Sequence, residues 1–369
     1  MFKFTKLEEK LKTLFRIILS HEFLLAISLT VLLIIVGVIL GYENLQKVPA
    51  THVLSRLYRQ EPNNKLSFMS NWDGPFYIKI AVNGYNKMSL TNFFPLYPLL
   101  ISFLHKFISS PLYSALLVAW LSLIGVIYYY IKIVKHFFKT ESNSEALKAV
   151  LLFIVFPSAV FFLATFTESL FAFVSLAAIY YAMKNRYILS GLLGMLATAT
   201  RPNGVFIVLL TGIILFENKK SLTKIFTNLF LGSLGILSYM FYLYLRYSNP
   251  LTFILTQEKH GWLQHLFITQ ARNFTPLNLI FIIPVIISIF YWWNRKRSFA
   301  IYSALFILIP LLGGQFGGFV RYTLMTFPVF LMLYDYLRNK ADLYYVTLLL
   351  LGIGWTFILL QYTGGYIGG

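Results

Sequence analysis

The stretch FLLAISLTVLLIIVGVIL, residues 23–40, carries no charged side chain and follows a basic N-terminal segment. A helix that crosses a bilayer needs roughly 20 mostly apolar residues. This run is longer than the core of a signal peptide and lacks a small-residue cleavage site. We therefore expect a first transmembrane helix that is retained in the mature protein.

The rest of the chain repeats this apolar character. Hydrophobic residues make up 58% of the 369 residues and charged residues only 12%, whereas an ordinary soluble domain has roughly 25% charged residues. We predict an all-α polytopic membrane protein, a single domain over 1–369 with about 11 transmembrane helices. The candidate spans are 22–41, 111–131, 149–165, 168–183, 188–200, 204–216, 225–247, 276–293, 299–312, 322–337 and 343–361.

The positions of lysine and arginine predict the orientation. Cytoplasmic loops are enriched in these residues, and the best agreement puts the N-terminus inside the cell. In this topology residues 42–110 form the first non-cytoplasmic loop, and residues 93–108 lie at the outer interface as a helical segment that does not cross. We accordingly expect a multi-pass membrane protein with its N-terminus in the cytoplasm and with its outer loops carrying the chemistry.

The charged residues also narrow the classes of partner. The chain has 31 Lys and Arg against 13 Asp and Glu, a formal net charge of +18. The positive charges are spread over many short loops, which favours membrane lipids and lipid phosphates over nucleic acid. Cysteine is absent, so disulfides, thiolate metal sites and cysteine nucleophiles are excluded. The histidines show no paired ligand spacing; we expect no cofactor and no metal site, although a divalent metal stays open.

Asp73 is a scarce carboxylate within Asn71-Trp72-Asp73-Gly74, in the aromatic-rich first outer loop. One interpretation is structural, because Asp is a good N-cap and the following Gly74-Pro75 suits the start of a helix. The other is functional: Asp73 acts as a general base that takes a proton from a hydroxyl.

Three further charged residues are candidates. Thr165-Phe166-Thr167-Glu168 fits a capping box, but Glu168 also suits a place beside Asp73, where it would orient the acceptor or raise the pKa of the base. Arg201, within Arg201-Pro202-Asn203-Gly204, and Arg321, after the glycine-rich stretch 313–318, suit phosphate binding. Snorkelling to lipid headgroups is the alternative for both arginines.

Aromatic and polar residues suggest substrate contacts. The motifs Asn83-Gly84-Tyr85 and Phe93-Phe94-Pro95-Leu96-Tyr97-Pro98 are typical of either an interfacial aromatic belt or the wall of a substrate groove. The loop Gln257-Glu258-Lys259-His260-Gly261-Trp262 suits sugar recognition, or is simply a solvated loop. The candidate substrate-binding residues are Trp72, Tyr85, Tyr97, Lys259, His260 and Trp262.

These motifs, taken in order, resemble the PIG-V-type mannosyltransferases, in their prokaryotic branch. The resemblance runs from about Trp72 to Phe330 and is most specific in Trp72-Asp73-Gly74 and residues 80–98; Thr167-Glu168-Ser169, Thr200-Arg201-Pro202-Asn203-Gly204 and Arg321-Tyr322 continue it. It implies a GT-C glycosyltransferase fold, an active site on the non-cytoplasmic face and a polyprenyl-phosphate sugar donor.

The resemblance also implies roles for the candidate residues. The family's catalytic aspartate lies early in the first outer loop, where Asp73 lies. We expect an inverting transfer of a sugar, mannose by this resemblance, to a hydroxyl of a lipid, glycan or protein acceptor. Asp73 and Glu168 would be catalytic, and Arg201 and Arg321 would bind the donor phosphate. The alternative is a lipid or sugar transporter or flippase, which the absence of internal repeats and of midplane acids disfavours.

Overall fold

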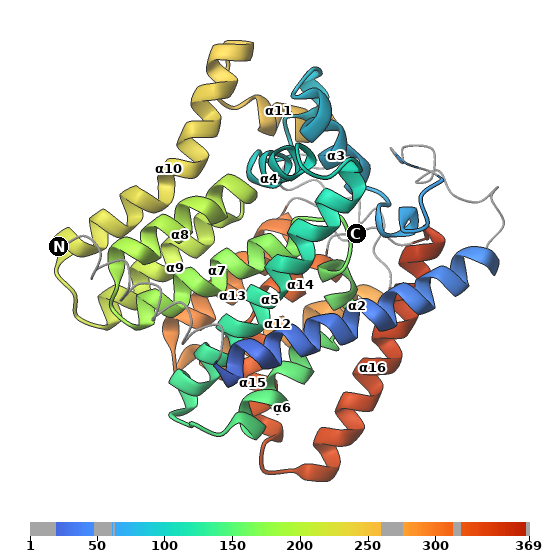
Figure 1. Cartoon of the computed structure of the whole chain (residues 1–369). Coiled ribbons are helices and arrows are strands. Elements are labelled where there is room, and N and C mark those ends of the chain that lie inside the picture. Colours follow the sequence, from blue (N-terminus) through green and yellow to red (C-terminus); the bar gives the residue numbers. More distant parts are fainter. Residues whose placement is uncertain (1–19, 48–60, 62, 260–275, 313–318, 367–369) are drawn as a thin grey trace, which may run out of the picture.

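A computed structural model describes residues 20–47, 61, 63–259, 276–312 and 319–366, and Figure 1 shows the whole chain. Within these ranges the regular structure is helical and no β-strand occurs, which confirms the all-α prediction. The elements are α2 (His21–Lys47), η3 (Ser67–Met69), α3 (Gly74–Asn83), η4 (Met88–Leu90), α4 (Leu96–His105), α5 (Pro111–Phe138), α6 (Asn143–Ile154), η5 (Pro157–Phe162), α7 (Glu168–Met183), α8 (Tyr187–Thr200), α9 (Gly204–Glu217), α10 (Leu222–Tyr247), α11 (Thr252–Lys259), α12 (Pro276–Trp293), α13 (Arg297–Leu312), α14 (Phe319–Met325), α15 (Pro328–Leu337) and α16 (Ala341–Gly364).

Four helices of the described chain are long and apolar enough to cross a membrane: α2, α5, α10 and α16. Several shorter apolar helices accompany them, among them α7, α8, α9, α12 and α15. Such short helices reach across a bilayer only in part, since a span needs roughly 20 residues. The molecule is a multi-pass membrane protein that combines four long apolar helices with shorter ones in its described part.

Two of the expected spans are not continuous helices. The predicted span 149–165 contains the end of α6 at Ile154 and a 3-10 helix from Pro157, and the span 322–337 breaks between Met325 and Pro328. Proline lacks an N–H and disfavours a helical conformation in the residue before it. Both prolines therefore start a new element, and the predicted spans are wrong in this respect.

The segment 93–108, expected at the outer interface, contains a helix that is too short to cross the membrane. α4 has 10 residues, a length of about 15 Å at 1.5 Å per residue, or about half of the hydrocarbon core. It packs against α3 and α5, and Figure 1 shows α3 and α4 together at the upper edge of the bundle, beside α11.

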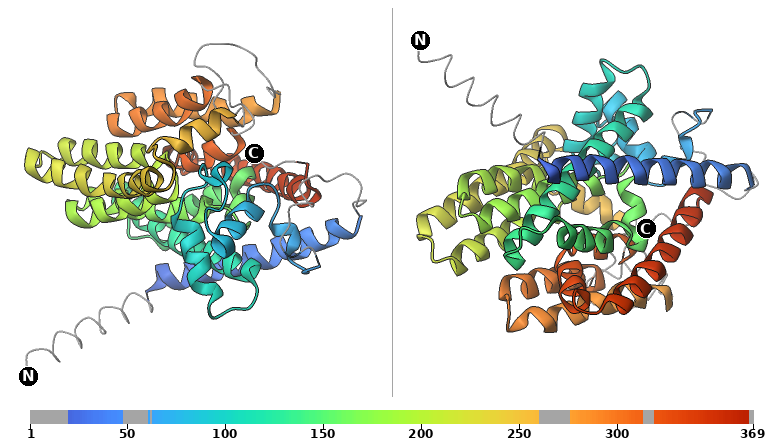
Figure 2. Two further views of the ribbon diagram at one scale, coloured as in Figure 1. Left: turned by 90° about the horizontal axis from the view of Figure 1, so that it is seen from above. Right: turned by 60° about the horizontal axis from the view of Figure 1, so that its bottom comes forward.

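The first and last described helices, α2 and α16, lie side by side at one end. Figure 2 shows them converging there, and Asn44 Nδ2 donates hydrogen bonds to the Leu360 carbonyl (2.8 Å) and to Thr363 Oγ1 (2.9 Å). α16 also packs along η5. Because η5 leads directly into the segment before α7, the C-terminal part of α16 lies beside the loops that begin α3 and α7.

Candidate active site

Four charged residues that are far apart in the sequence form one ion-pair network, which we call the charge cluster. Arg321 Nη1 lies 2.7 Å from Asp73 Oδ2, and Arg321 Nε lies 2.6 Å from Glu168 Oε1. The same Glu168 oxygen lies 2.7 Å from Arg201 Nη1. The cluster thus contains both residues predicted to be catalytic and both predicted to bind phosphate.

Each member stands at or near the end of a helix. Asp73 directly precedes α3, Glu168 is the first residue of α7, Arg201 directly follows α8, and Arg321 is the third residue of α14. Long side chains at helix ends can converge without opening the apolar interfaces between helices. The cluster is therefore a product of where four helices begin or end at the same side of the bundle.

The structural interpretations of the two carboxylates are correct about where the helices begin but wrong about the capping hydrogen bonds. Asp73 occupies the N-cap position of α3 but makes no side-chain capping hydrogen bond, because its carboxylate is turned to Arg321. Thr167 occupies the N-cap position of α7 and likewise makes no capping bond. Thr165, expected in a capping box, instead donates to Ser70 Oγ over 3.0 Å. Both acids are therefore committed to the cluster.

The cluster is buried at its centre and open at its edges. The Glu168 side chain is fully buried and Arg321 is 8% exposed, while Arg201 is 15% and Asp73 25% exposed. The Arg321 guanidinium also stacks over the Phe166 ring, 4.5 Å from its centroid. Two carboxylates and two guanidiniums balance in charge, which is what a buried ionic group requires. Asp73 is the carboxylate that a substrate can reach.

The loop before Asp73 is fixed by the distant helix α16. Asn71 Nδ2 donates to the carbonyls of Phe68 (3.1 Å) and Tyr362 (2.8 Å), and the Asn71 N–H donates to the Tyr362 hydroxyl (3.2 Å). That hydroxyl in turn donates to the Met69 carbonyl over 3.0 Å. Tyr362 therefore binds the loop on both sides of Ser70 and sets the direction in which Asp73 leaves it.

Gly74 allows a close approach that a larger residue would block. A Cβ on Gly74 would lie 2.1 Å from Thr165 Oγ1 and 3.0 Å from Ser70 Oγ. The Thr165 N–H donates to the Met69 carbonyl over 3.0 Å, so the segment that leads to Glu168 runs against the loop that carries Asp73. The glycine after Asp73 is needed to bring the two carboxylates to one arginine.

The predicted aromatic contacts divide into reachable and buried residues. Trp72 is 40% exposed and has a left-handed backbone (φ 54°), a strained conformation for a bulky residue. Tyr97 is fully buried and donates to the Ala115 carbonyl. Tyr85 donates to the Phe93 carbonyl over 2.6 Å and packs on Tyr239. The exposed ring of Trp72 beside Asp73 fits the predicted substrate contact best.

The remaining predicted contacts cannot be placed. Lys259 is the last residue of α11, but its side chain lies outside the described residues, as do His260 and Trp262. Among the residues that the structure does describe, no group of three or more His, Cys, Asp and Glu could hold a metal ion. Independence from metal and cofactor stays a prediction.

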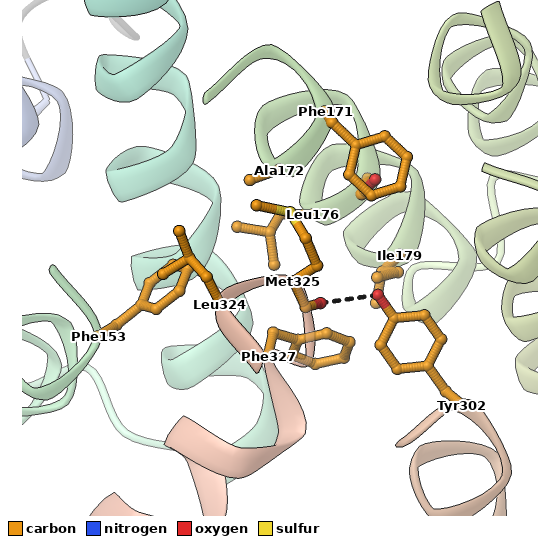
Figure 3. Close-up of a pocket in the computed structure, with 10 residues that line it drawn as sticks. Phe153, Phe171, Ala172, Leu176, Ile179, Tyr302, Leu324, Met325 and Phe327 are labelled. Carbon is orange, nitrogen blue, oxygen red and sulfur yellow. Dashed lines mark hydrogen bonds between the residues drawn. The ribbon is translucent and has the colours of Figure 1, made fainter. Parts of the chain in front are cut away.

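A small apolar pocket lies one helical turn below the charge cluster, between α7 and α14 (Figure 3). Phe171 and Ala172 follow Glu168 by one turn, and Leu324 and Met325 follow Arg321 by one turn. The Tyr302 hydroxyl closes one side by donating to the Met325 carbonyl over 2.8 Å. The mostly apolar lining lowers the local dielectric constant on this side of the ion pairs, and charges interact more strongly at low dielectric constant.

Sequence reasoning selected the four charged residues but missed their supports. Asn71, Thr165, Tyr77 and Tyr362 were not predicted to contribute. Tyr77 had a usable signal, since it follows Asp73 by four residues and shares a helix face with it. Tyr362 had none, because 291 residues separate it from Asn71.

Comparison with known families decides the class of protein. A family model described as mannosyltransferase (PIG-V) matches residues 14–257. The chain belongs to the mannosyltransferase (PIG-V) family. It is accordingly a membrane glycosyltransferase, which agrees with the resemblance and sets the transporter alternative aside. No curated protein matches the chain. The family match includes Asp73, Glu168 and Arg201 and ends before Arg321, so it covers less of the C-terminal part than the resemblance suggested.

Proposed function

We propose that this mannosyltransferase moves mannose from a polyprenyl-phosphate donor to a hydroxyl of a lipid, glycan or protein acceptor. The observation that carries the proposal is the Asp73–Arg321–Glu168–Arg201 network: an accessible carboxylate is paired with one of two guanidiniums that a buried carboxylate holds in place. A base beside fixed cations suits an alcohol nucleophile and a phosphate leaving group.

The reaction needs one proton transfer. The acceptor oxygen attacks the anomeric carbon of the sugar while its proton passes to Asp73. The bond between that carbon and the phosphate oxygen breaks, and its electron pair leaves with the polyprenyl phosphate. Arg321 occupies Asp73 Oδ2, whereas Oδ1 accepts no hydrogen bond within the described part of the chain and is available to the acceptor. A single displacement of this kind inverts the anomeric centre.

The arginines would stabilise the charge that develops on the leaving phosphate. Preorganised donors of this type are among the largest contributions to catalysis. Glu168 has no exposed surface, so it does not reach a substrate itself. Its proposed role is to orient both guanidiniums toward the position that the phosphate occupies, in place of the predicted contact with the acceptor.

The basic residues at the opposite helix ends support the orientation that we propose for the site. Glu168 begins α7, and Lys184 and Arg186 directly follow its end; α7 has 16 residues, which corresponds to about 24 Å. Lys135 and Lys139 similarly mark the end of α5. Because basic loops favour the cytoplasmic side, we place the charge cluster on the non-cytoplasmic face of the plasma membrane of a prokaryotic cell.

The proposal is tested by a donor comparison. The purified full chain in lipid nanodiscs is incubated with polyprenyl-phosphate mannose, polyprenyl-phosphate glucose or GDP-mannose, together with a membrane extract as the source of acceptor. We expect release of polyprenyl phosphate from the mannose donor and incorporation of mannose into the extract. Transfer from GDP-mannose by the purified protein, without a lipid intermediate, would contradict the proposed donor.

A further inference from the structure

Tyr77 stands next to the charge cluster on the helix that Asp73 begins. It follows Asp73 by four residues in α3, and its N–H donates to the Asp73 carbonyl over 3.3 Å. Residues four apart lie on the same face of a helix. The Tyr77 ring is held edge-on by Phe93 and Tyr97, with centroid distances of 5.0 and 5.3 Å. The side chain therefore has a fixed direction beside Asp73.

The hydroxyl of Tyr77 makes no hydrogen bond to any residue that the structure describes. Only 6% of the residue is exposed, yet within the described ranges this hydroxyl neither donates nor accepts a hydrogen bond. Its neighbours behave differently: Tyr97 donates to Ala115, and Tyr239 donates to the Thr91 carbonyl over 2.6 Å. The Tyr77 hydroxyl is not one of the fully buried side-chain atoms that lack a partner, so part of it is accessible, and a group that enters the site can reach it.

A tyrosine hydroxyl is protonated at neutral pH and can donate a hydrogen bond, and the surroundings of Tyr77 do not oppose this. Burial first, and then the nearby Asp73 carboxylate, raise the pKa of Tyr77 to about 12, with Arg201, Arg321 and Glu168 also acting on it. All four members of the charge cluster thus influence the one hydroxyl. It stays protonated at neutral pH and can donate its proton in a hydrogen bond to an acceptor oxygen.

A phosphate that enters the cluster needs such a donor. Arg321 is bonded to both carboxylates and Arg201 to Glu168, so part of their donor capacity is already committed. The two carboxylates also offset the positive charge that would attract an anion. A neutral hydroxyl with no partner adds a hydrogen bond without disturbing this balance.

We propose that the Tyr77 hydroxyl donates a hydrogen bond to the phosphate of the lipid-phosphate sugar donor, alongside the two arginines. The inference rests on the proposed function and adds a substrate contact to it. It distinguishes Tyr77 from Tyr97, whose hydroxyl is used inside the protein.

The test uses Tyr77→Phe, which keeps the ring and removes only the oxygen. Binding of polyprenyl monophosphate and of polyprenyl-phosphate mannose is measured on the full chain in nanodiscs. We expect both affinities to fall about tenfold, the range of a hydrogen bond to a charged group. The melting temperature without ligand should not fall, because the lost hydroxyl makes no hydrogen bond to the residues that the structure describes.

Tyr239→Phe is the matched control. It removes a buried hydroxyl that donates to Thr91, and we expect a lower melting temperature with unchanged affinity for both lipids. Unchanged affinity in Tyr77→Phe would overturn the inference, and so would a loss confined to the mannose-bearing lipid, which would assign the contact to the sugar. If the unmodified chain binds neither lipid, the donor class itself is wrong, and the inference fails with the proposed function.

Discussion

Arg321 Nη1 donates to Asp73 Oδ2 over 2.7 Å, although 248 residues separate the two in the sequence. Through its Nε the same guanidinium holds Glu168, so one side chain joins the accessible carboxylate to the buried one. Without substrate, Asp73 is therefore held in one direction by the Arg321 guanidinium. In the proposed mechanism, this fixed direction presents the other carboxylate oxygen of Asp73 to the acceptor alcohol.

Asp73→Asn should leave a folded protein with little mannose transfer. The amide oxygen can still accept from Arg321, but the residue can no longer take a proton, and a positioned base contributes roughly 10²–10⁴ in rate. The measurement is release of polyprenyl phosphate from polyprenyl-phosphate mannose. Glu141→Gln, a change at an exposed carboxylate, is the control and should retain activity. Near-normal turnover by Asp73→Asn would exclude the residue as the base.

Replacing Arg321 should destabilise the protein more than replacing Arg201. Arg321→Met leaves Asp73 unpaired and Glu168 with Arg201 alone, and breaking a buried ion pair costs about 3–5 kcal/mol. Arg201→Met should cost less, because Glu168 keeps Arg321 and Arg201 is the more exposed of the two. Thermal unfolding in detergent measures both.

The double variant Glu168→Gln with Arg321→Met provides a check on this interpretation. Because it removes the buried charge along with its partner, it should recover part of the stability that Arg321→Met loses. A larger loss for Arg201→Met than for Arg321→Met, or additive losses in the double variant, would contradict the central position of Arg321.

Gly74→Ala should lower the transfer rate, although it adds a single carbon atom. The new Cβ would lie 2.1 Å from Thr165 Oγ1, so the loop that carries Asp73 must shift, and a displacement of about 1 Å can cost about a hundredfold in rate. The double variant with Thr165→Ala should regain part of the transfer rate. Gly352→Ala, whose Cβ would meet its nearest neighbour at 3.6 Å, is the control. Full activity in Gly74→Ala would show that the close approach is not needed.

Glu61 should make stability depend on pH at the start of α5. Burial raises the pKa of Glu61, but hydrogen bonds from Ser110, the Leu112 N–H and Asn64 outweigh it, so that the pKa lies below its ordinary value of 4.5. The stabilisation is therefore fully present above pH 4.5 and is lost as the pH falls through the lowered pKa.

The corresponding measurement compares the melting temperatures of the unmodified chain and Glu61→Gln between about pH 3 and 7. The unmodified chain should be the more stable at neutral pH, and the difference should vanish on acidification. If the advantage of the unmodified chain over Glu61→Gln instead grew on acidification, the folded protein would favour protonated Glu61, and the pKa of Glu61 would be raised rather than lowered. Ser110→Ala removes one of the donors and should reduce the same difference.

The sequence predicted the helices well because apolar runs report burial in lipid or protein directly. It failed where proline divides a run, at Pro157 and Pro328, since hydropathy averages over such breaks. The charged site residues were found because acids are scarce in this chain. Their pairing was not found, because contacts across 153 or 248 residues leave no local pattern. The interpretation of Glu168 changed for this reason, from a contact with substrate to a support for two arginines.

The hydrogen bonds between Tyr362 and Asn71 can form only late in the synthesis of the chain. The ribosome makes the Asp73 loop 291 residues before the tyrosine that fixes it, a delay of roughly 15–60 s at about 5–20 residues per second. Until Arg321 and then Tyr362 have been made, the loop lacks these two contacts, and the direction of Asp73 is not fixed by them. Transferase activity should therefore begin only after α16 is in place, so a partly synthesised chain in the membrane does not act on the lipids around it.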